Sequence, residues 1–143
     1  MKLQPDVRLF VDGHAVVGEC PVWDPQTDAL YWIDVKAPAL YRSNARTGVT
    51  LTWRLPSDVG GFALTEDGGS AVVALRTGIF RLDLTSNLLS KLTDPPFDPR
   101  THRFNEVDCD FAGRLWLGVM FEPEPGVQAE PRMSVIYSRV RPA

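Results

Sequence analysis

The sequence lacks long apolar segments of either common kind. No stretch repeats apolar residues at the helical period of 3.6 over ten or more positions, and none approaches the roughly 18 apolar residues of a membrane-spanning helix. Residues 1–10 include Lys2, Asp6 and Arg8 and contain no apolar core of a secretory signal. The sequence therefore predicts neither a helical bundle nor a membrane-inserted or exported chain.

Basic charge and cysteine are also scarce. The net charge is −3 at pH 7 and the basic residues are spread over the whole chain, which gives no electrostatic reason to expect binding to nucleic acid or to an anionic membrane. Cys20 and Cys109 show neither C-x-x-C nor Cys/His spacing. We expect two buried free thiols in a reducing cytoplasm, ahead of a disulfide or a zinc site.

The sequence consists instead of short apolar runs separated by turn residues. Its 143 residues suit one domain, with 44% hydrophobic residues to form a core. The 12 prolines and 11 glycines would interrupt most helices. The runs between them are rich in Val, Leu, Ile, Trp, Tyr and Phe, which favour strands. The predicted fold class is all-β.

The strand patterns recur as a repeat. Apolar strands begin at Leu30, Ala71 and Leu115, at intervals of 41 and 44 residues. Four short antiparallel strands within a period of this length are typical of β-propeller blades. The expected units span about residues 18–56, 57–95 and 103–143.

The third unit is incomplete. A loop rich in glutamate and proline follows Met120, and only one further strand is expected, at about residues 133–140, before Ala143. Fewer than about four blades do not close a ring. We expect a fragment of a longer propeller, or a chain that assembles with another, unless the repeat is misread. A further strand expected at residues 7–11 could close such a ring.

Three motifs in these units resemble a known family. They are Gly18–Asp34 (GECPVWDPQTDALYWID), Val59–Leu64 (VGGFAL) and Arg103–Met120 (RFNEVDCDFAGRLWLGVM). Together they resemble the regucalcin/gluconolactonase family, which includes luciferin-regenerating proteins and related sugar lactonases. The resemblance implies a six-bladed β-propeller, of which this chain would be the N-terminal half. One departure is that Glu106 and Val107 replace the Asp-Gly that follows the asparagine in the family.

The resemblance also implies a site. A divalent cation (Ca²⁺, Zn²⁺, Mn²⁺ or Mg²⁺) would sit at the mouth of the central channel, with Glu19 as one ligand. Arg103 and Asn105 would line the substrate pocket. The family often has acidic residues just after the strand that ends at Met120; Phe121-Glu122-Pro123-Glu124 departs from that pattern, and Glu122 is the residue assigned to the pocket. The family's other ligands, an asparagine and an aspartate that also acts as general base, would come from beyond Ala143. The catalytic residues of this chain therefore stay unknown.

The residues themselves allow more than one interpretation. Glu19 leads a predicted strand beside Gly18 and could bind a hard cation, or be a solvated loop glutamate. Arg103 and Asn105 flank Phe104, so in an extended segment they share one face while Phe104 packs inward. A guanidinium and an amide both donate to oxygen, which suits a polyhydroxylated ligand with a carbonyl group. The alternative is a surface arginine and a turn asparagine.

The tryptophans have a structural interpretation as well as a functional one. Trp32 and Trp116 occupy equivalent positions in apolar strands of two repeats. Tryptophans can form a platform on which a sugar ring stacks, but equivalent places in apolar strands favour packing between blades. We expect both side chains in the inter-blade core.

The predicted function is metal-dependent hydrolysis of a sugar lactone or a similar cyclic ester. The cation would polarise the carbonyl group and lower the pKa of a bound water, while Arg103 and Asn105 position the substrate. On this chain alone the activity is expected to be incomplete. Two alternatives stay open: a half-propeller that binds a divalent cation and pairs with a second copy as a homodimer, and a truncated module without catalysis.

Overall fold

The computed structural model describes residues 6–139, and the regular secondary structure in this range consists of β-strands alone. The strands are β1 (Gly18–Asp24), β2 (Ala29–Asp34), β3 (Ala39–Asn44), β4 (Thr50–Arg54), β5 (Val59–Leu64), β6 (Ser70–Leu75), β7 (Gly78–Asp83), β8 (Leu89–Thr93), β9 (His102–Cys109), β10 (Leu115–Phe121) and β11 (Val135–Arg139). Within residues 6–139 no helix is long and apolar enough to cross a membrane.

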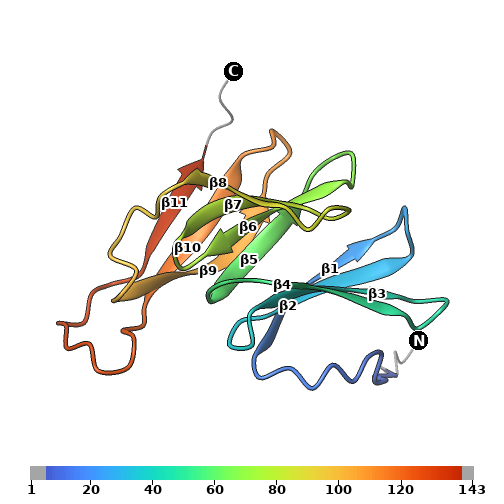
Figure 1. Cartoon of the computed structure of the whole chain (residues 1–143), viewed down its shortest axis with the longest axis horizontal. Helices are drawn as coiled ribbons and strands as arrows, with labels where there is room; N and C mark the ends of the chain where they lie inside the picture. The colour runs from blue at the N-terminus through green and yellow to red at the C-terminus, as the bar shows by residue number, and fades with distance from the viewer. Residues whose placement is uncertain (1–5, 140–143) are drawn as a thin grey trace, which may run out of the picture.

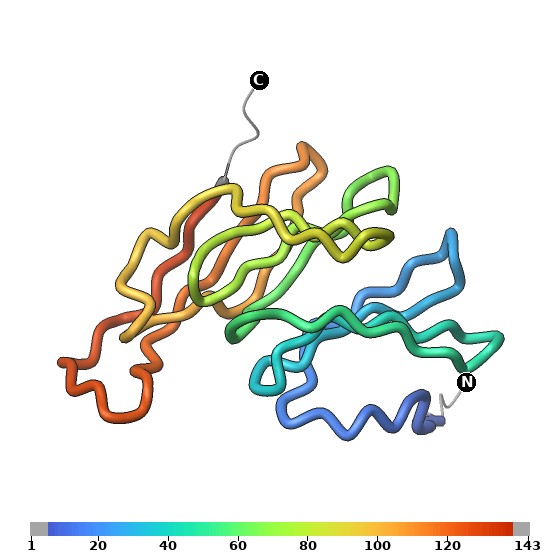
Figure 2. Tube along the Cα trace, in the orientation of Figure 1, coloured from blue at the N-terminus to red at the C-terminus, as the bar shows by residue number. Residues whose placement is uncertain are grey.

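The strands form three antiparallel sheets that follow one another along the chain (Figure 1 and Figure 2). Blade 1 contains β1–β4 and blade 2 contains β5–β8, each in sequence order, and blade 3 has the order β11-β10-β9. The first strands of the blades adjoin, since β5 contacts both β1 and β9. This arrangement confirms the all-β prediction: the chain is a partial β-propeller whose third blade has three strands in the described range.

Side-chain oxygens fix the turns between neighbouring strands. Each of four such residues accepts a hydrogen bond from the backbone N–H two positions further on, at 2.9–3.0 Å: Asp24, Asn44, Asp83 and Asp110. Asp and Asn favour turns because their short side chains can make this bond. The turn residues that punctuate the sequence therefore define where each hairpin reverses.

The cores lie between the blades, and β6 contributes to two of them. Val73 and Leu75 point toward blade 1, into a buried cluster that also contains Ile33 and Leu40. Ala74 points the opposite way, into a second cluster with residues of β9 and β10. Side chains on a strand alternate between its two faces. Because both faces of β6 are covered, its sequence is almost continuously apolar.

Blades 2 and 3 approach each other closely at Gly60. A Cβ added to Gly60 would lie 2.1 Å from the backbone carbonyl oxygen of Phe104. The ladders of all three first strands are also irregular at corresponding places, after Glu19 in β1, after Val59 in β5 and at Glu106 in β9. Such bulges bend a strand and redirect its side chains. The first strands therefore bend at the same level.

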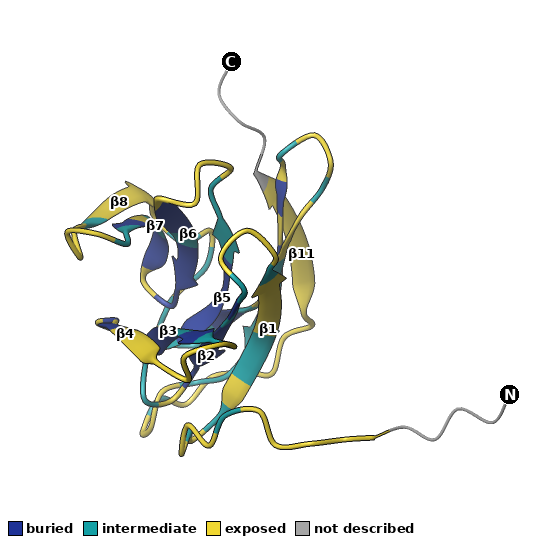
Figure 3. Cartoon of the chain, turned by 90° about the vertical axis from the view of Figure 1, so that its right-hand side faces the viewer, coloured by how far each residue is buried: buried dark blue, intermediate teal, exposed yellow. Residues whose placement is uncertain are grey.

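Some expectations differ from the structure at the edges of the molecule. Residues 7–11, expected to form a strand, form none, because no strand in the described range pairs with them. Neither tryptophan lies in the inter-blade core: Trp32 is buried but stacks on Tyr41 of its own blade, on the face of β2 opposite to Tyr31 and Ile33, and Trp116 is 41% exposed. Trp116 lies on the face of β10 opposite to the residues packed against blade 2, and Figure 3 shows the outer strands β4, β8 and β11 largely exposed.

The cysteines also differ from the expectation of two buried thiols. Both Cys20 and Cys109 are free, as expected. Cys20 is only partly buried, and Cys109 is exposed because it ends β9 next to a surface turn.

Candidate functional site

Arg103 and Asn105 lie side by side on β9. They flank Phe104, which is 1% exposed, so the alternation of the strand turns both polar side chains to the other face. Arg103 Nη1 donates to Asn105 Oδ1 at 3.2 Å and to the carbonyl oxygen of Phe104 at 3.0 Å. The guanidinium and the amide thus form one unit.

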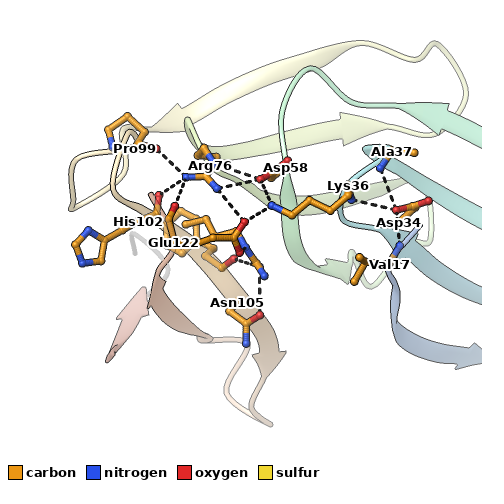
Figure 4. Close-up of polar contacts among 12 residues, drawn as sticks. Val17, Asp34, Lys36, Ala37, Asp58, Arg76, Pro99, His102, Asn105 and Glu122 are labelled. Carbon is orange, nitrogen blue, oxygen red and sulfur yellow. Dashed lines mark hydrogen bonds and ion pairs between the residues drawn. The ribbon is translucent and has the colours of Figure 1, made fainter. Parts of the chain in front are cut away.

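Glu122 joins this pair from the neighbouring strand. It follows β10 directly, and Met120 is paired with Arg103, so the two side chains emerge on one face. Glu122 Oε2 accepts a hydrogen bond from Arg103 Nε at 2.6 Å. Its Oε1 accepts from Lys36 Nζ and, at 3.4 Å, from Arg76 Nη2. The structure therefore brings together Arg103, Asn105 and Glu122, the three residues expected in the substrate pocket (Figure 4).

Three further charged residues, which no motif indicated, extend this contact: Lys36, Asp58 and Arg76. Asp58 Oδ2 accepts from Lys36 Nζ at 2.8 Å and from Arg76 Nη2 at 3.0 Å. Lys36, Arg76 and Glu122 each stand within two residues of the end of the second strand of their blade. This shared position in the repeat could have indicated Lys36 and Arg76 from the sequence. We refer to Lys36, Asp58, Arg76, Arg103 and Glu122 as the charged cluster; Figure 4 labels all of them except Arg103.

The charged cluster favours the ionised forms of its members. Burial by itself raises the pKa of Glu122, but hydrogen bonds from Lys36 and Arg103 outweigh burial and leave that pKa below its ordinary value. The pKa of Asp58 is lowered in the same way, with Lys36 and Arg76 overcoming burial. Burial lowers the pKa of Lys36, and its hydrogen bonds to both carboxylates more than compensate, so the result is a raised pKa. At neutral pH the cluster holds three positive and two negative charges.

Glu19 lies apart from the charged cluster. It is partly buried near the start of β1 and lines an open cavity of about 490 Å³ together with Glu106. Within residues 6–139 it makes no hydrogen bond or ion pair with Arg103, Asn105 or Glu122. The irregularities of the two ladders place Glu19 at the level of Glu106, which lies three residues along β9 from Arg103.

Glu19, Glu106 and Asp108 are the carboxylates that line this cavity. Carboxylate oxygen suits hard divalent cations, but Ca²⁺ takes six to eight oxygen ligands. In the described part of the chain no group of three or more His, Cys, Asp or Glu residues is placed to hold a metal ion. These residues alone therefore do not complete a metal site.

Cys20 follows Glu19 and lines the same cavity. Burial, and then the charges of Glu19 and Glu106, raises the pKa of its thiol to about 11. The thiol points to the carbonyl oxygen of Gly60, with 3.8 Å between sulfur and oxygen. A neutral thiol is a poor nucleophile, so Cys20 is not a candidate for covalent catalysis at pH 7.

These features define a partial β-propeller that gathers a buried arginine, an amide and several charges at one end of its blades. Residues 17–140 match the family model described as the SMP-30/Gluconolactonase/LRE-like region, and the chain belongs to this family. The resemblance seen in the three sequence motifs is thereby confirmed.

Individual relatives cover the chain but extend well beyond it. The chain is 41% identical over 117 residues to the 6-deoxy-6-sulfogluconolactonase of Pseudomonas putida. This match covers 82% of the chain and 40% of that protein. It is 31% identical over 114 residues to the L-arabinolactonase of Azospirillum brasilense, which covers 80% of this chain and 38% of that protein. The structure of regucalcin from Agrobacterium tumefaciens, a calcium-binding protein, matches with a TM-score of 0.75 and 23% identity over 87% of this chain and 40% of that one. The chain thus spans about 40% of the length of its relatives.

Proposed function

We propose that this chain supplies the lactone-binding residues of a protein that hydrolyses sugar lactones. The observation that carries the proposal is the pairing of Arg103 with Asn105, held by Glu122, in a chain whose curated relatives include sugar lactonases. The names of the two relatives specify different sugar lactones, so the proposal extends to the class and not to one sugar.

The pair offers two hydrogen-bond donors to a substrate. Arg103 Nη2 and Asn105 Nδ2 have no hydrogen-bond partner among residues 6–139, while their neighbouring atoms are engaged. When water adds to a lactone carbonyl, its oxygen gains negative charge before the ring C–O bond breaks to give the hydroxy acid. Donors aimed at that oxygen stabilise the charge as it develops. Arg103 and Asn105 would bind and orient the lactone and stabilise this oxygen.

We extend the proposal to a divalent cation, Ca²⁺, Zn²⁺, Mn²⁺ or Mg²⁺, with Glu19 as one of its ligands and the remaining ligands supplied from outside residues 6–139. The support is the carboxylate chemistry of the Glu19 cavity and the calcium binding stated for the regucalcin of similar fold. Such a cation, when bound, polarises a carbonyl group and lowers the pKa of a bound water.

Lactone opening can be measured directly on the chain. Glucono-1,5-lactone is supplied with Ca²⁺, Zn²⁺ or Mn²⁺, and the acid released is titrated at constant pH. A cation-dependent rate above spontaneous opening would show that the remaining ligands are supplied, and this rate should be lost in Arg103→Met and Glu19→Gln. Glu66→Gln, an exposed glutamate of a turn in blade 2, is the matched control. If no cation raises the rate, the enzyme claim for this chain fails and a non-catalytic module remains.

A second candidate, a homodimer of half-propellers, is favoured by the exposed apolar surfaces at both ends of the chain of blades. Trp116 and Ile136 are exposed on blade 3, and Trp23 is exposed on blade 1. The outer edge of β11 has no strand partner in the described range. Covering these surfaces with a second copy would remove apolar area from water at about 25 cal/mol per Å². Sedimentation should then give twice the 15.9 kDa chain mass at micromolar concentration, and a stable monomer would rule the dimer out.

A further inference from the structure

Both carboxylate oxygens of Glu122 are already engaged by cations. Oε2 accepts from Arg103 Nε, and Oε1 accepts from Lys36 and Arg76. Arg76 also donates through Nη1 to the backbone carbonyl oxygen of Glu122 at 3.0 Å. The carboxylate therefore contacts other protein side chains. Among these side chains, Arg103 also donates a hydrogen bond to Asn105.

We propose that Lys36 and Arg76 are positioning residues: they hold Glu122 in place, and Glu122 in turn sets the orientation of the Arg103–Asn105 donor pair toward its ligand. The inference rests on the proposed function, because it presumes that this pair binds a lactone. It adds to the site two residues from blades 1 and 2, which share no motif with β9.

Arg76 is held in a fixed position by burial and by several hydrogen bonds. It is 6% exposed, and its guanidinium contacts Asp58 through Nε and Nη2, at 3.3 and 3.0 Å. Its Nη1 donates to the carbonyl oxygens of Pro99 at 3.0 Å and His102 at 3.3 Å. Arg76 therefore fixes both the entry to β9 and the exit from β10. The planar guanidinium reaches all these acceptors with five N–H donors in a rigid fork, so that one Nη1 hydrogen is shared between two carbonyl oxygens.

Lys36 supplies the contact from blade 1. Its backbone is fixed by Asp34, whose Oδ1 accepts from the N–H groups of Lys36 and Ala37 at 3.0 Å each (Figure 4). Its Nζ bridges Asp58 and Glu122. The side chain is 35% exposed, so it can be substituted with little disturbance of the core.

The charge balance supports a role beyond joining the blades. Two carboxylates neutralise two of the three cations in the cluster, which leaves one unit of positive charge. Arg103 presents this charge, because its Nη2 is the guanidinium nitrogen without a partner among residues 6–139. Positive charge next to a lactone carbonyl favours the negative charge that develops on its oxygen.

The test uses the whole chain, labelled with ¹⁵N, and glucono-1,5-lactam as the probe, in which a ring amide replaces the hydrolysable ester. NMR spectra record the Arg103 Nε–H signal and the side-chain amide of Asn105 during titration. We expect the lactam to shift both signals in the unaltered chain. We expect Lys36→Met and Arg76→Lys to bind it about tenfold more weakly and to show an altered Arg103 signal before the probe is added.

Conservative and remote substitutions separate positioning from folding. Lys36→Arg keeps a cation between Asp58 and Glu122 and should restore affinity to within about threefold. Lys91→Met removes an exposed lysine paired with Asp94 in blade 2 and should leave affinity unchanged. Thermal unfolding of every variant shows that folded chains are compared, and Lys36→Met decides the matter if Arg76→Lys does not fold.

The two proposals fail in different ways. If the lactam shifts neither Arg103 nor Asn105 in the unaltered chain, the proposed lactone binding is wrong. If it shifts both, and Lys36→Met binds it with the same affinity and the same Arg103 signal, lactone binding stands and the positioning role is overturned.

Discussion

Arg103 Nε and Glu122 Oε2 are 2.6 Å apart across two paired strands, and this contact joins the donor pair on β9 to the rest of the charged cluster. Both partners are largely removed from water, with side chains 7% and 28% exposed. A charge-assisted hydrogen bond in such a place is shorter and stronger than one between neutral groups. Removing the charge of Glu122 should therefore change the free energy of unfolding measurably.

Glu122→Gln should lower the free energy of unfolding by about 1–3 kcal/mol. The amide preserves the shape of the side chain, but the cluster then holds three cations with Asp58 as its one remaining carboxylate, and Arg103 loses its carboxylate partner. Urea unfolding followed by tryptophan fluorescence measures the change. Glu124→Gln, two residues along and exposed, is the matched control and should stay within about 0.5 kcal/mol. Equal stability of the two variants would show that the cluster contributes nothing to folding.

Stability should fall with acid in a way that depends on Glu122. The pKa of Glu122 and that of Asp58 lie below their ordinary values of 4.5 and 3.8, so the unfolded chain binds more protons in that region. The two carboxylates contribute fully to the free energy of unfolding at pH values above these ordinary pKa values. This contribution is lost as the pH falls through their lower pKa values in the folded state. The raised pKa of Lys36 affects stability at alkaline pH, where the contribution of Lys36 to the free energy of unfolding is lost only as the pH rises above 10.5.

The matching experiment compares unfolding free energies from about pH 6 to pH 3. The unaltered chain should lose stability more steeply over this interval than Glu122→Gln, in which one of the titrating groups is missing. Other carboxylates are common to both proteins and cancel in the comparison. Parallel curves would contradict the lowered pKa of Glu122.

Cys20 should react far more slowly with iodoacetamide than Cys109. With a thiol pKa of about 11, only about one Cys20 in a thousand is a thiolate at pH 8. Cys109 is exposed, and mass spectrometry of Cys109→Ser and Cys20→Ser chains measures each thiol separately. Glu106→Gln should speed the reaction of Cys20 because it removes a charge that raises this pKa, whereas Glu66→Gln should not. A Cys20 rate that matches that of Cys109 would refute the raised pKa.

Gly60→Ala should lower stability by about 1–3 kcal/mol or more, because the added Cβ would meet the backbone of Phe104 at 2.1 Å. Relief requires β5 and β9 to separate, which would also displace Arg103 and Asn105. Gly69→Ala is the control, since the atoms nearest to its added Cβ belong to the Asp67 side chain and begin at 3.6 Å. Calorimetric unfolding temperatures measure both, and an equal small effect would mean that the blades are less tightly apposed.

The repeat and its strands could be predicted because each strand carries its own signal. Leu30, Ala71 and Leu115 mark equivalent apolar strands, and Asp or Asn side chains bond to the turns between them. The placement of Arg103 and Asn105 on one face also followed from the period of two. These features depend on residues close together in sequence.

The charged cluster could not be predicted in that way. Its contacts join Lys36 to Glu122 and Arg76 to Glu122, residues from different blades that meet only once the sheets are packed. The exposure of Trp116 depends likewise on what covers its face of blade 3, since the same apolar strand pattern serves a covered and an uncovered face.

Lys36, Arg76 and Glu122 stand one or two residues beyond the second strands of three successive blades. One extra residue inserted before any of them would shift it by about 3.3 Å and turn its side chain to the opposite face. The hairpins at the other end of the blades, such as Asp24–Ala29 and Asp110–Leu115, contribute nothing to the cluster. The short spacing between each second strand and its member of the charged cluster is therefore constrained, and the hairpins at the other end of the blades are free of that constraint.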